Sequence, residues 1–522
     1  MKKLYIITAA LPYANGPIHI GHLSGVYLPS DLYVKFLKFL SKKVIFISGS
    51  DEYGVNILIK SKLNKTSPKY IVNKYYKINR SIFKKFNINF DHFIRTTNKK
   101  HHLLAKYFFF KMKKEGDIIK KKTYQFFDPL NKEYLPDKYI EGVCKYCLNK
   151  SNLDICENCG KFLFIKDIKL PKSILNKNKL YIKSTINWCL KLKDNYNFLY
   201  LWLKSKKKKW KTITYKYAFS FLKSIIKYKS ITRDLKWGIP IYKNKVLYVW
   251  FEALIAYLSV FCKDNIHDYK YYWNNKYNKI IQFIGKDNII FHTIIFPIIL
   301  KNLNLKLPNI IVSNEFLNYK NKKISTSKNY GIFCDSFLKN KNNNKDYLRF
   351  FLIYNMPENK DYNYITKNFV FIINKVLINI IGNLFNRVIS LLKMKKKCKI
   401  NFFVTSKNII YIFCKNILKK IKKNILKFKF KNSLYKYINL AIYGNKYFTK
   451  KKIWKYYQNS NYLNNILIII YFLIQLMFLY LPFNSKKILK NFNIKQKKYN
   501  SLKKIRKIKF HIKKYKKLFK KI

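Results

Sequence analysis

Acidic residues are scarce in this chain: 24 Asp and Glu stand against 108 Lys and Arg among 522 residues, a formal net charge of +84. Glycine and proline are also rare, with 13 and 12 residues. A positive field of this size attracts polyanions and speeds their capture. The abundant residue types (Lys, Asn, Ile, Phe, Tyr) have A/T-rich codons, whereas Gly and Pro have G/C-rich ones. The charge therefore fits nucleic-acid binding, and it equally fits codon bias in an AT-rich, reduced bacterial genome.

Cysteines number nine, an odd count, and only four of them cluster in the sequence. This pattern excludes a secreted disulfide framework and predicts free thiols in a reducing compartment. The first strand-like run begins at Leu4 with no signal-peptide or transit-type pattern before it, so a cytoplasmic protein is expected. The longest apolar run, residues 466–481, is shorter than the roughly 20 residues of a bilayer span. We therefore predict a buried helix there and no membrane partner.

Strand-like and helix-like segments alternate near the N-terminus, beginning with the apolar runs 4–7 and 44–48. The alternation returns later in the chain, where the runs 246–249, 280–284 and 310–312 predict further strands. Strands that alternate with helices predict a parallel, doubly wound α/β sheet. Ligands bind such sheets at the carboxyl ends of the strands.

The order of these patterns predicts a Rossmann-type domain that is interrupted by an insertion. The insertion contains the cysteine cluster and then a lysine-rich, helix-prone region. Beyond residue 365 strand signals vanish, which predicts an all-α helical bundle with a basic C-terminal tail. The predicted division is 1–115 for the first half of the α/β domain, 116–230 for the insertion, 231–365 for the second half and 366–522 for the helical domain.

The segment 12–22, PYANGPIHIGH, lies between the first strand and the amphipathic stretch 23–40. Its two histidines, His19 and His22, are three residues apart and so share one face of the first helical turn. Free backbone N–H groups and the helix dipole favour a phosphate there, and Gly21 permits close approach to the backbone. The pattern predicts stabilisation of charge on a nucleotide α-phosphate during displacement. Taken alone, it also fits two ordinary histidines at a helix start.

A second strong pattern is the cysteine cluster. Two C-x2-C pairs are separated by eight residues, a spacing that places four thiolates around one Zn²⁺. Four protein ligands close the coordination sphere, so the ion is expected to be structural. The expected ligands are Cys144, Cys147, Cys156 and Cys159.

Together with the preceding residues 10–16, ALPYANG, the histidine segment resembles the HIGH signature of class I aminoacyl-tRNA synthetases, in the version of the methionyl-tRNA synthetase family. Further motifs follow in the family's order over nearly the whole chain. The resemblance implies activation of methionine by ATP, with Mg²⁺, to methionyl-adenylate and pyrophosphate. Transfer to tRNA(Met) then follows. It also implies a monomer, since an extra C-terminal dimerising module is not expected.

The segment 322–327, KKISTS, resembles the family's KMSKS loop, whose lysines neutralise phosphate charge. Lys323 matches the first lysine, and Ser325 and Ser327 match the serines. Thr326 stands where the family has its second lysine. That departure brings the rate of adenylate formation into question, and Lys322 or Lys328 could substitute.

The segment 249–257, VWFEALIAY, resembles the family's amino-acid pocket. Trp250 would contact the thioether, a favourable sulfur–aromatic contact, and Asp51 would hold the substrate ammonium. Without the resemblance, core packing explains the aromatic residues equally well. The other residues expected in the pocket are Leu11, Tyr13, Ala253, Leu254, Tyr257 and His292.

Three further family positions belong to the nucleotide and the reacting centre. Gly285 would let adenosine approach the backbone, and Asp287 would accept hydrogen bonds from nucleotide hydroxyls. Arg233 matches a family arginine near the reacting centre, so we expect it, with His19, His22 and Lys323, to be catalytic.

Asn379, Asn383 and Arg387 are four residues apart, which predicts one polar helix face. Amide and guanidinium groups read the edges of unstacked bases, and an aromatic side chain stacks on them. The resemblance implies that these residues and Trp454 read the anticodon. An ordinary solvated helix face is the alternative.

Two rival interpretations remain. Another class I synthetase is disfavoured, because an insertion of about 115 residues is small for an editing domain and the cysteines lie outside the pocket. A tRNA-binding relative that has lost catalysis is suggested by Thr326 but opposed by His19, His22, Asp51 and Trp250.

Overall fold

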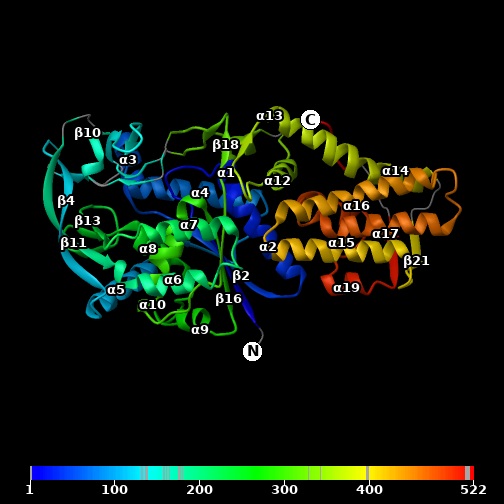
Figure 1. Cartoon of the computed structure of the whole chain (residues 1–522). Coiled ribbons are helices and arrows are strands. Elements are labelled where there is room, and N and C mark those ends of the chain that lie inside the picture. Colours follow the sequence, from blue (N-terminus) through cyan, green and yellow to red (C-terminus); the bar gives the residue numbers. More distant parts are fainter. Residues whose placement is uncertain are drawn as a thin grey trace.

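The computed structural model describes residues 3–130, 133–135, 139–156, 159, 161–163, 165–174, 178, 180–326, 328–340, 343–394, 399–511 and 518–522. An α/β part contains the N-terminal and central residues, and a bundle of long helices extends from it (Figure 1). Ser327 lies outside the described residues, so its predicted role stays a prediction.

The centre of the α/β part is a five-stranded parallel sheet in the order β17-β16-β1-β2-β3. Its strands are largely apolar and buried, as expected for a sheet with helices on both faces. The chain adds β2 and β3 on one side of β1 and β16 and β17 on the other, so the strand order reverses between β1 and β16. Ligands bind at the carboxyl ends of strands at such a reversal. The strands are β1 (Leu4–Ala9), β2 (Lys43–Ser50), β3 (His92–Arg95), β16 (Lys279–Gly285) and β17 (Ile310–Asn314).

The predicted amphipathic helix after β1 is continuous but not uniform. It begins as α1 (Ile20–His22), continues as the π-helical turn η1 (Leu23–Tyr27) and ends as α2 (Leu28–Phe39). The other helices of the first half are α3 (Val55–Leu63), α4 (Pro68–Lys85) and α5 (Lys99–Lys114).

The insertion contains helices in the predicted lysine-rich region, α6 (Tyr196–Lys204) and α7 (Thr212–Lys223), but its largest element is a long antiparallel ribbon that was not predicted. In this ribbon β4 (Ile118–Asp128) pairs with β11 (Tyr181–Lys191). Exposed and buried residues alternate in part of β11, a period-two pattern that the abundance of lysine obscured. The remaining elements are β5 (Glu133–Leu135), β6 (Ile140–Cys144), β7 (Lys150–Asn152), β8 (Asp154–Ile155), β9 (Phe162–Leu163), η3 (Ile165–Asp167), β10 (Ile168–Ser173), η4 (Lys193–Asn195) and β12 (Tyr228–Ser230).

The second half of the α/β part begins with a small sheet of β13 (Thr232–Arg233), β14 (Pro240–Tyr242) and β15 (Lys245–Leu247). The strand predicted at 246–249 is shorter than expected, because α8 (Val249–Ser259) begins two residues after β15 ends. The other elements are α9 (Tyr269–Trp273), η5 (Lys286–Asn288), η6 (Phe291–Ile295), α10 (Phe296–Asn302), β18 (Leu317–Tyr319), β19 (Lys322–Lys323), α11 (Cys334–Lys339), α12 (Lys345–Tyr354) and β20 (Tyr362–Tyr364).

The C-terminal part is mainly helical, but the absence of strands predicted after residue 365 is wrong. β21 (Lys399–Phe403) pairs with β22 (Lys507–His511) in an antiparallel ribbon. In β22 exposed lysines alternate with buried Ile508 and Phe510, so the period-two signal was present in the sequence. The helices are α13 (Thr366–Ile372), η7 (Ile373–Gly382), α14 (Asn383–Met394), α15 (Ile409–Leu426), α16 (Phe430–Lys450), α17 (Ser460–Met477), α18 (Pro482–Asn491) and α19 (Tyr499–Lys503).

The buried helix predicted for 466–481 is confirmed by α17, whose residues from Ile466 to Met477 are all buried. By length and composition alone, α17 and the helical stretch Thr366–Met394 could each cross a membrane. In α17, 72% of the most apolar window is buried within the fold. A core helix has the same length and composition, so these two stretches are weak evidence for a span.

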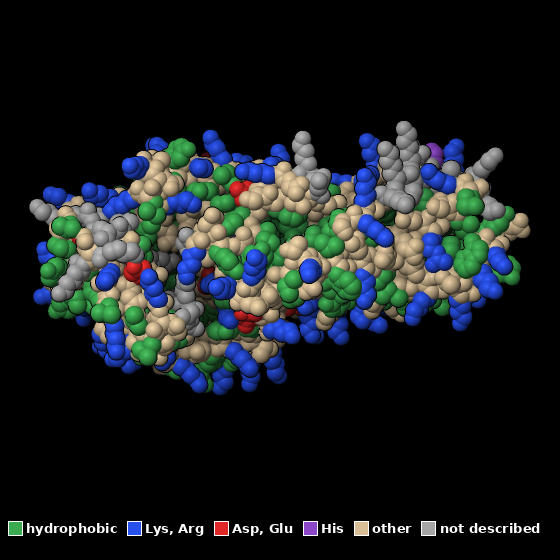
Figure 2. Space-filling model, turned by 90° about the horizontal axis from the view of Figure 1, so that it is seen from above, with side chains coloured by type: hydrophobic (Ala, Val, Ile, Leu, Met, Phe, Trp, Pro, Cys, Tyr) green, Lys and Arg blue, Asp and Glu red, His purple; other side chains and the backbone are tan. Residues whose placement is uncertain are grey.

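Two features of the charged residues matter for function. Buried Arg349 of α12 donates to Asp31 of α2 at 2.7 Å and to the carbonyl of Phe86 at 2.8 Å, which links the segment before the bundle to the helix that follows the two histidines. On the surface, Lys and Arg side chains are spread along the whole visible face instead of forming one patch (Figure 2). This distribution fits a compositional origin for much of the charge.

Candidate active site

The two histidines lie at the carboxyl end of β1 and stack on each other, with ring centroids 3.7 Å apart. The Nδ1 atom of each ring accepts a hydrogen bond from the backbone N–H of the other residue, at 3.2 and 3.3 Å. The loop before them is held by buried Asn79 of α4, which accepts from the N–H of Ile18 and donates to the carbonyl of Gly16. The predicted HIGH geometry is therefore built by the loop, by α1 and by α4.

This arrangement determines the protonation of both rings. The pKa of His22 is lowered to about 4, mainly by burial; Asp287 opposes the shift and nearby Lys323 contributes to it. Burial, His22 and Lys323 also hold the pKa of His19 well below its usual value. Both imidazoles are therefore neutral near pH 7. Because Nδ1 accepts in each ring, the proton is on Nε2, which leaves two N–H donors for a phosphate.

Buried neutral histidines make stability depend on pH. Burial also lowers the pKa of His292 to about 4, while an unfolded histidine titrates near 6.5. As the pH falls from about 6.5 to about 4, the unfolded chain binds protons first, so stability decreases by up to about 1.4 kcal/mol per pH unit for each such group. Urea unfolding across this window should show the decrease in the free energy of unfolding. In His292→Gln the dependence of this free energy on pH should be weaker by the contribution of one titrating group, up to about 1.4 kcal/mol per pH unit. Equal slopes for both proteins would contradict the assignment.

The second nucleotide element packs directly on the histidine segment. Ile20 donates to the carbonyl of Ile332 and Cys334 to that of Ile18, so the chain that follows the KMSKS-like loop forms backbone hydrogen bonds with residues 18–20. Lys323, at the end of the β18–β19 hairpin, lies with its ammonium 4.2 Å from the ring centroid of Phe316. Its charge lowers the pKa of both histidines, which places it on the same site.

Gly285 and Asp287 lie at the carboxyl end of β16, next to the histidine segment. A Cβ on Gly285 would lie 2.6 Å from a carboxylate oxygen of Asp287, so a larger residue here would require the Asp287 side chain to move. A Cβ on Gly21 would similarly lie 3.0 Å from the ring of His19. The structure thus brings Gly21, His22 and Asp287 to one edge of the sheet.

Thr326 faces the loop before the histidines, since its methyl group fills the space in which a Cβ of Gly16 would stand. The ammonium of Lys60 lies 3.9 Å from that same position and donates to the carbonyl of Asn15 at 2.7 Å. Sequence analysis missed Lys60, which lies on α3, far from both motifs in the chain. Ser325 pairs with Tyr330 across the loop.

The predicted methionine pocket is assembled around α8. The Trp250 ring stacks on Phe291 with centroids 3.7 Å apart and planes 4° from parallel. Tyr257 donates to Nε2 of His292 at 3.0 Å, and Nδ1–H of His292 donates to the carbonyl of Asn288. The backbone of Leu11 contacts the Tyr257 hydroxyl, while Ala253 and Leu254 are buried on the same helix.

Tyr13 and Asp51 meet at the carboxyl ends of β1 and β2, where they form an isolated parallel bridge. Burial, Asp51, Tyr248 and Glu252 together raise the pKa of Tyr13 well above its usual value, so these carboxyl and phenol groups lie close to the Tyr13 hydroxyl. Gly54 has a φ of +101°, and a Cβ there would collide with the Tyr13 hydroxyl. Glycine is therefore required beside the pocket.

Two buried carboxyl groups beside Asp51 and Trp250 were missed by sequence analysis. Glu52 accepts two hydrogen bonds from Nε of Arg95, at 2.7 and 2.9 Å, and one from Thr97. Glu252 lies 2.7 Å from Nε2 of His101, and burial raises the pKa of this carboxyl well above its usual value and lowers that of His101 to about 3. Both groups are thus neutral, and the carboxyl donates to the imidazole. Other acidic residues, including Asp31 and Asp346, are also buried, so residue type alone did not distinguish these two.

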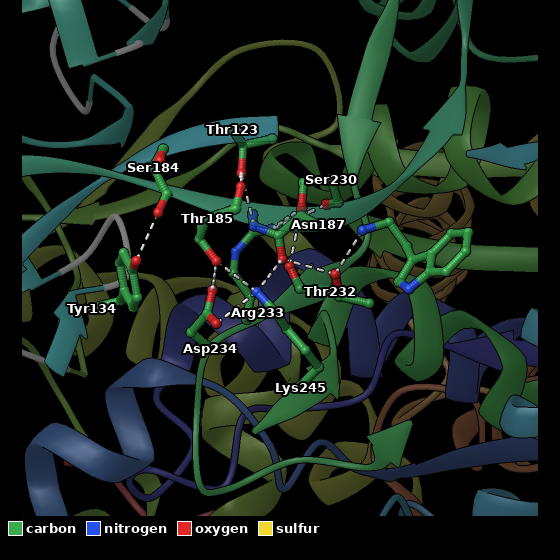
Figure 3. Close-up of polar contacts among 11 residues, drawn as sticks. Thr123, Tyr134, Ser184, Thr185, Asn187, Ser230, Thr232, Arg233, Asp234 and Lys245 are labelled. Carbon is green, nitrogen blue, oxygen red and sulfur yellow. Dashed lines mark hydrogen bonds and ion pairs between the residues drawn. The ribbon is translucent and has the colours of Figure 1, made fainter. Parts of the chain in front are cut away.

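Arg233 lies on β13 and is 8% exposed. Its Nη1 donates to the carbonyl and hydroxyl oxygens of Ser230 and to the carbonyl of Thr232, and its guanidinium lies 4.1 Å from the ring centroid of Tyr248. Tyr248 directly precedes α8, and it contributes to the raised pKa of Tyr13. The Tyr248 side chain therefore lies between Arg233 and the pocket. Figure 3 shows the polar side chains that surround it.

The four clustered cysteines come together in the insertion. Their Sγ atoms all lie within 4.8 Å of one another; those of Cys147 and Cys156 are 3.6 Å apart, and those of Cys144 and Cys159 are 3.9 Å apart. Thiolates about 2.3 Å from a tetrahedral Zn²⁺ have this spacing. The described donors Cys144, Cys147, Cys156 and Cys159 therefore fit a closed four-sulfur metal site.

In the helical part, Asn383 and Arg387 of α14 face α16. Asn383 donates to Asn445 at 3.3 Å, and Arg387 donates to Thr449 at 3.1 Å. The Arg387 guanidinium lies 4.4 Å from the ring of Phe448 and 5.9 Å from that of half-exposed Trp454. Asn379 is exposed in η7, where π-helical bonding means that a spacing of four does not complete a turn.

The α/β sheet with paired histidines at its strand reversal, the facing lysine loop and the helical bundle together define a class I tRNA synthetase. The family model described as tRNA synthetases class I (M) matches residues 5–389. A methionine–tRNA ligase of Bacteroides fragilis is 35% identical over 87% of this chain and 68% of its own length. The enzyme of Christiangramia forsetii is 37% identical over 94% and 73%.

Among solved structures, Mycobacterium tuberculosis methionyl-tRNA synthetase in complex with methionyl-adenylate has the same fold. Its TM-score is 0.82 at 20% identity, over 99% of both chains. The chain belongs to the methionine–tRNA ligase family of class I tRNA synthetases.

Proposed function

We propose that this chain joins L-methionine to ATP to form methionyl-adenylate and pyrophosphate, and then transfers methionine to tRNA(Met). The methionine carboxylate attacks the α-phosphorus, the bond to the β-phosphate bridging oxygen breaks, and pyrophosphate leaves with that electron pair. The ribose hydroxyl at the tRNA 3′ end then attacks the activated carbonyl and releases AMP. Family membership supports this reaction and leaves another class I specificity as the less favoured alternative.

The site suggests how each side chain contributes. Nε2–H of His19 and of His22 would donate to the α-phosphate as negative charge develops, and Lys323 would neutralise the leaving pyrophosphate with Mg²⁺. Gly21, Gly285 and Asp287 would hold the nucleotide. Asp51 would bind the methionine ammonium, while the walls around α8 would hold its thioether.

The observation that carries the proposal is the pair of neutral histidine donors between Lys323 and Asp287, beside the pocket around α8. The test is amino-acid-dependent ATP–pyrophosphate exchange with methionine, leucine, isoleucine, valine and cysteine. Exchange with methionine alone is expected. Exchange with another of these amino acids would show that the enzyme activates that amino acid and not methionine alone. A folded protein that binds tRNA without any exchange would be a catalytically impaired relative.

We also propose that the ammonium of Lys60 supplies the positive charge that Thr326 lacks, because both side chains approach the position that a Cβ of Gly16 would occupy. Lys60→Met should lower the exchange rate about tenfold, and Thr326→Lys in the same chain should restore most of it. Lys62→Met on the same helix is the control. Failure of Thr326→Lys to restore the rate would contradict the replacement.

The polar face of α14 and α16 would read the anticodon, with Trp454 as a stacking platform. Arg387→Ala should raise KM for tRNA by a factor equivalent to about 1–3 kcal/mol and leave methionine-dependent exchange unchanged. Arg80→Ala, which removes an exposed arginine from α4, serves as the matched control. Charging kinetics with unchanged KM for tRNA would show that this is only a solvated helix face.

A further inference from the structure

We infer that the buried side chain of Asn187 is a positioning residue for Arg233, through a polar network that ties the insertion to the reacting centre. The inference rests on the proposed function, which places Arg233 at that centre. The network joins β4 and β11 of the insertion to β13 and β15, which follow the insertion in the sequence (Figure 3).

Asn187 lies on β11 with an exposed fraction of 0%. Its Nδ2 donates to Oγ1 of Thr123 on β4 at 2.9 Å. Its Oδ1 accepts from Oγ1 of Thr232 on β13 at 2.8 Å and from the ammonium of Lys245 on β15 at 3.3 Å. A buried amide with partners at both ends forms a rigid network, because each lost partner would leave a desolvated polar group.

The network holds both chain neighbours of Arg233. Thr232 is bonded to Asn187 and also accepts from the backbone N–H of Trp188 at 3.0 Å. Asp234 forms an ion pair with Lys245 at 2.6 Å and accepts from Thr185 at 3.2 Å. Thr185 and Asn187 are two residues apart and so share one face of β11. The backbone of Arg233 is therefore anchored on each side to the same strand of the insertion.

The position of this backbone determines where the guanidinium lies. Arg233 donates to Ser230 and Thr232 within its own local segment, in the contacts described above, and its guanidinium lies 4.1 Å from the ring centroid of Tyr248. A shift of β13 would therefore move the guanidinium relative to Tyr248 and the adjoining pocket. Small misplacements of a positioned group cost large factors in rate.

A double-mutant cycle tests the inference in the full-length protein. Asn187→Leu should lower kcat of methionine-dependent exchange about tenfold, with KM for methionine unchanged within about twofold. In an Arg233→Ala background the same change should cost nothing further, because the residue through which it acts is gone. Asn187→Asp keeps both acceptor contacts and should recover most of the rate.

Asn195→Leu provides the matched control, since Asn195 is another buried asparagine, which donates to the carbonyl of Lys191. Its effect should add to that of Arg233→Ala. Should Asn187→Leu fail to fold by its thermal melt, Thr232→Val, which removes one hydroxyl, is taken through the same cycle.

Additive losses for Asn187→Leu and Arg233→Ala would overturn the inference and leave Asn187 a structural residue. An Arg233→Ala protein with wild-type exchange would also overturn it, while leaving the proposed function intact. A wild-type protein without methionine-dependent exchange would instead refute the proposed function on which the inference rests.

Discussion

His22→Ala should lower kcat of methionine-dependent ATP–pyrophosphate exchange by about 100- to 1,000-fold, the cost of removing one preorganised donor from a developing charge. The imidazole is neutral and its Nδ1 atom accepts from the N–H of His19, so Nε2–H is the group that is lost. KM for methionine should change little, because the pocket is built on α8 and not on α1. Steady-state exchange at saturating ATP measures both quantities.

The control for this substitution is His267→Ala, which removes an exposed histidine far along the chain from both motifs. It should exchange at the wild-type rate. Because both active-site histidines titrate well below neutrality, the wild-type exchange rate should also show no histidine titration between about pH 6 and about pH 8. A His22→Ala protein with undiminished kcat would remove this residue from the mechanism.

Cys156→Ser should release the zinc that we propose for the four-cysteine site and unfold the surrounding part of the insertion. Structural zinc sites of this kind contribute about 10–16 kcal/mol of apparent binding energy, so three remaining thiolates hold the ion far less tightly. Cys144 and Cys156 are buried in a small separate core with Leu153, which gives this region little stability apart from the metal. Metal analysis should find one zinc per wild-type chain and less in the variant.

Cys189→Ser is the matched control, because Cys189 is a buried free thiol on β11, outside the cluster. It should keep the metal. Limited proteolysis should then cut the Cys156→Ser protein between residues 133 and 174 and spare the control. Full metal content in Cys156→Ser would show that the four sulfurs do not form the site.

Much of the site could be predicted because its motifs are local. The histidine pair, the lysine loop and the C-x2-C pairs each place their functional atoms within a few residues, so their spacing alone determines which groups lie together. The structure confirms the meeting of His19 with His22 and of the four cysteines. The strand β22 was missed because its lysines at alternate positions were interpreted as composition instead of as the exposed face of a ribbon.

The sequence by itself determined the parallel α/β order, the histidine and cysteine motifs and the helical C-terminal part, because hydrophobic period and residue spacing are properties of short segments. Only the tertiary structure decided that Lys60 stands beside Thr326, that Arg95 satisfies Glu52, and that Asn187 anchors the strand of Arg233. These contacts join residues that are 43 to 266 positions apart, as in Arg95–Glu52 and Lys60–Thr326. The packing of whole elements brings such residues together, and no local sequence pattern indicates these contacts.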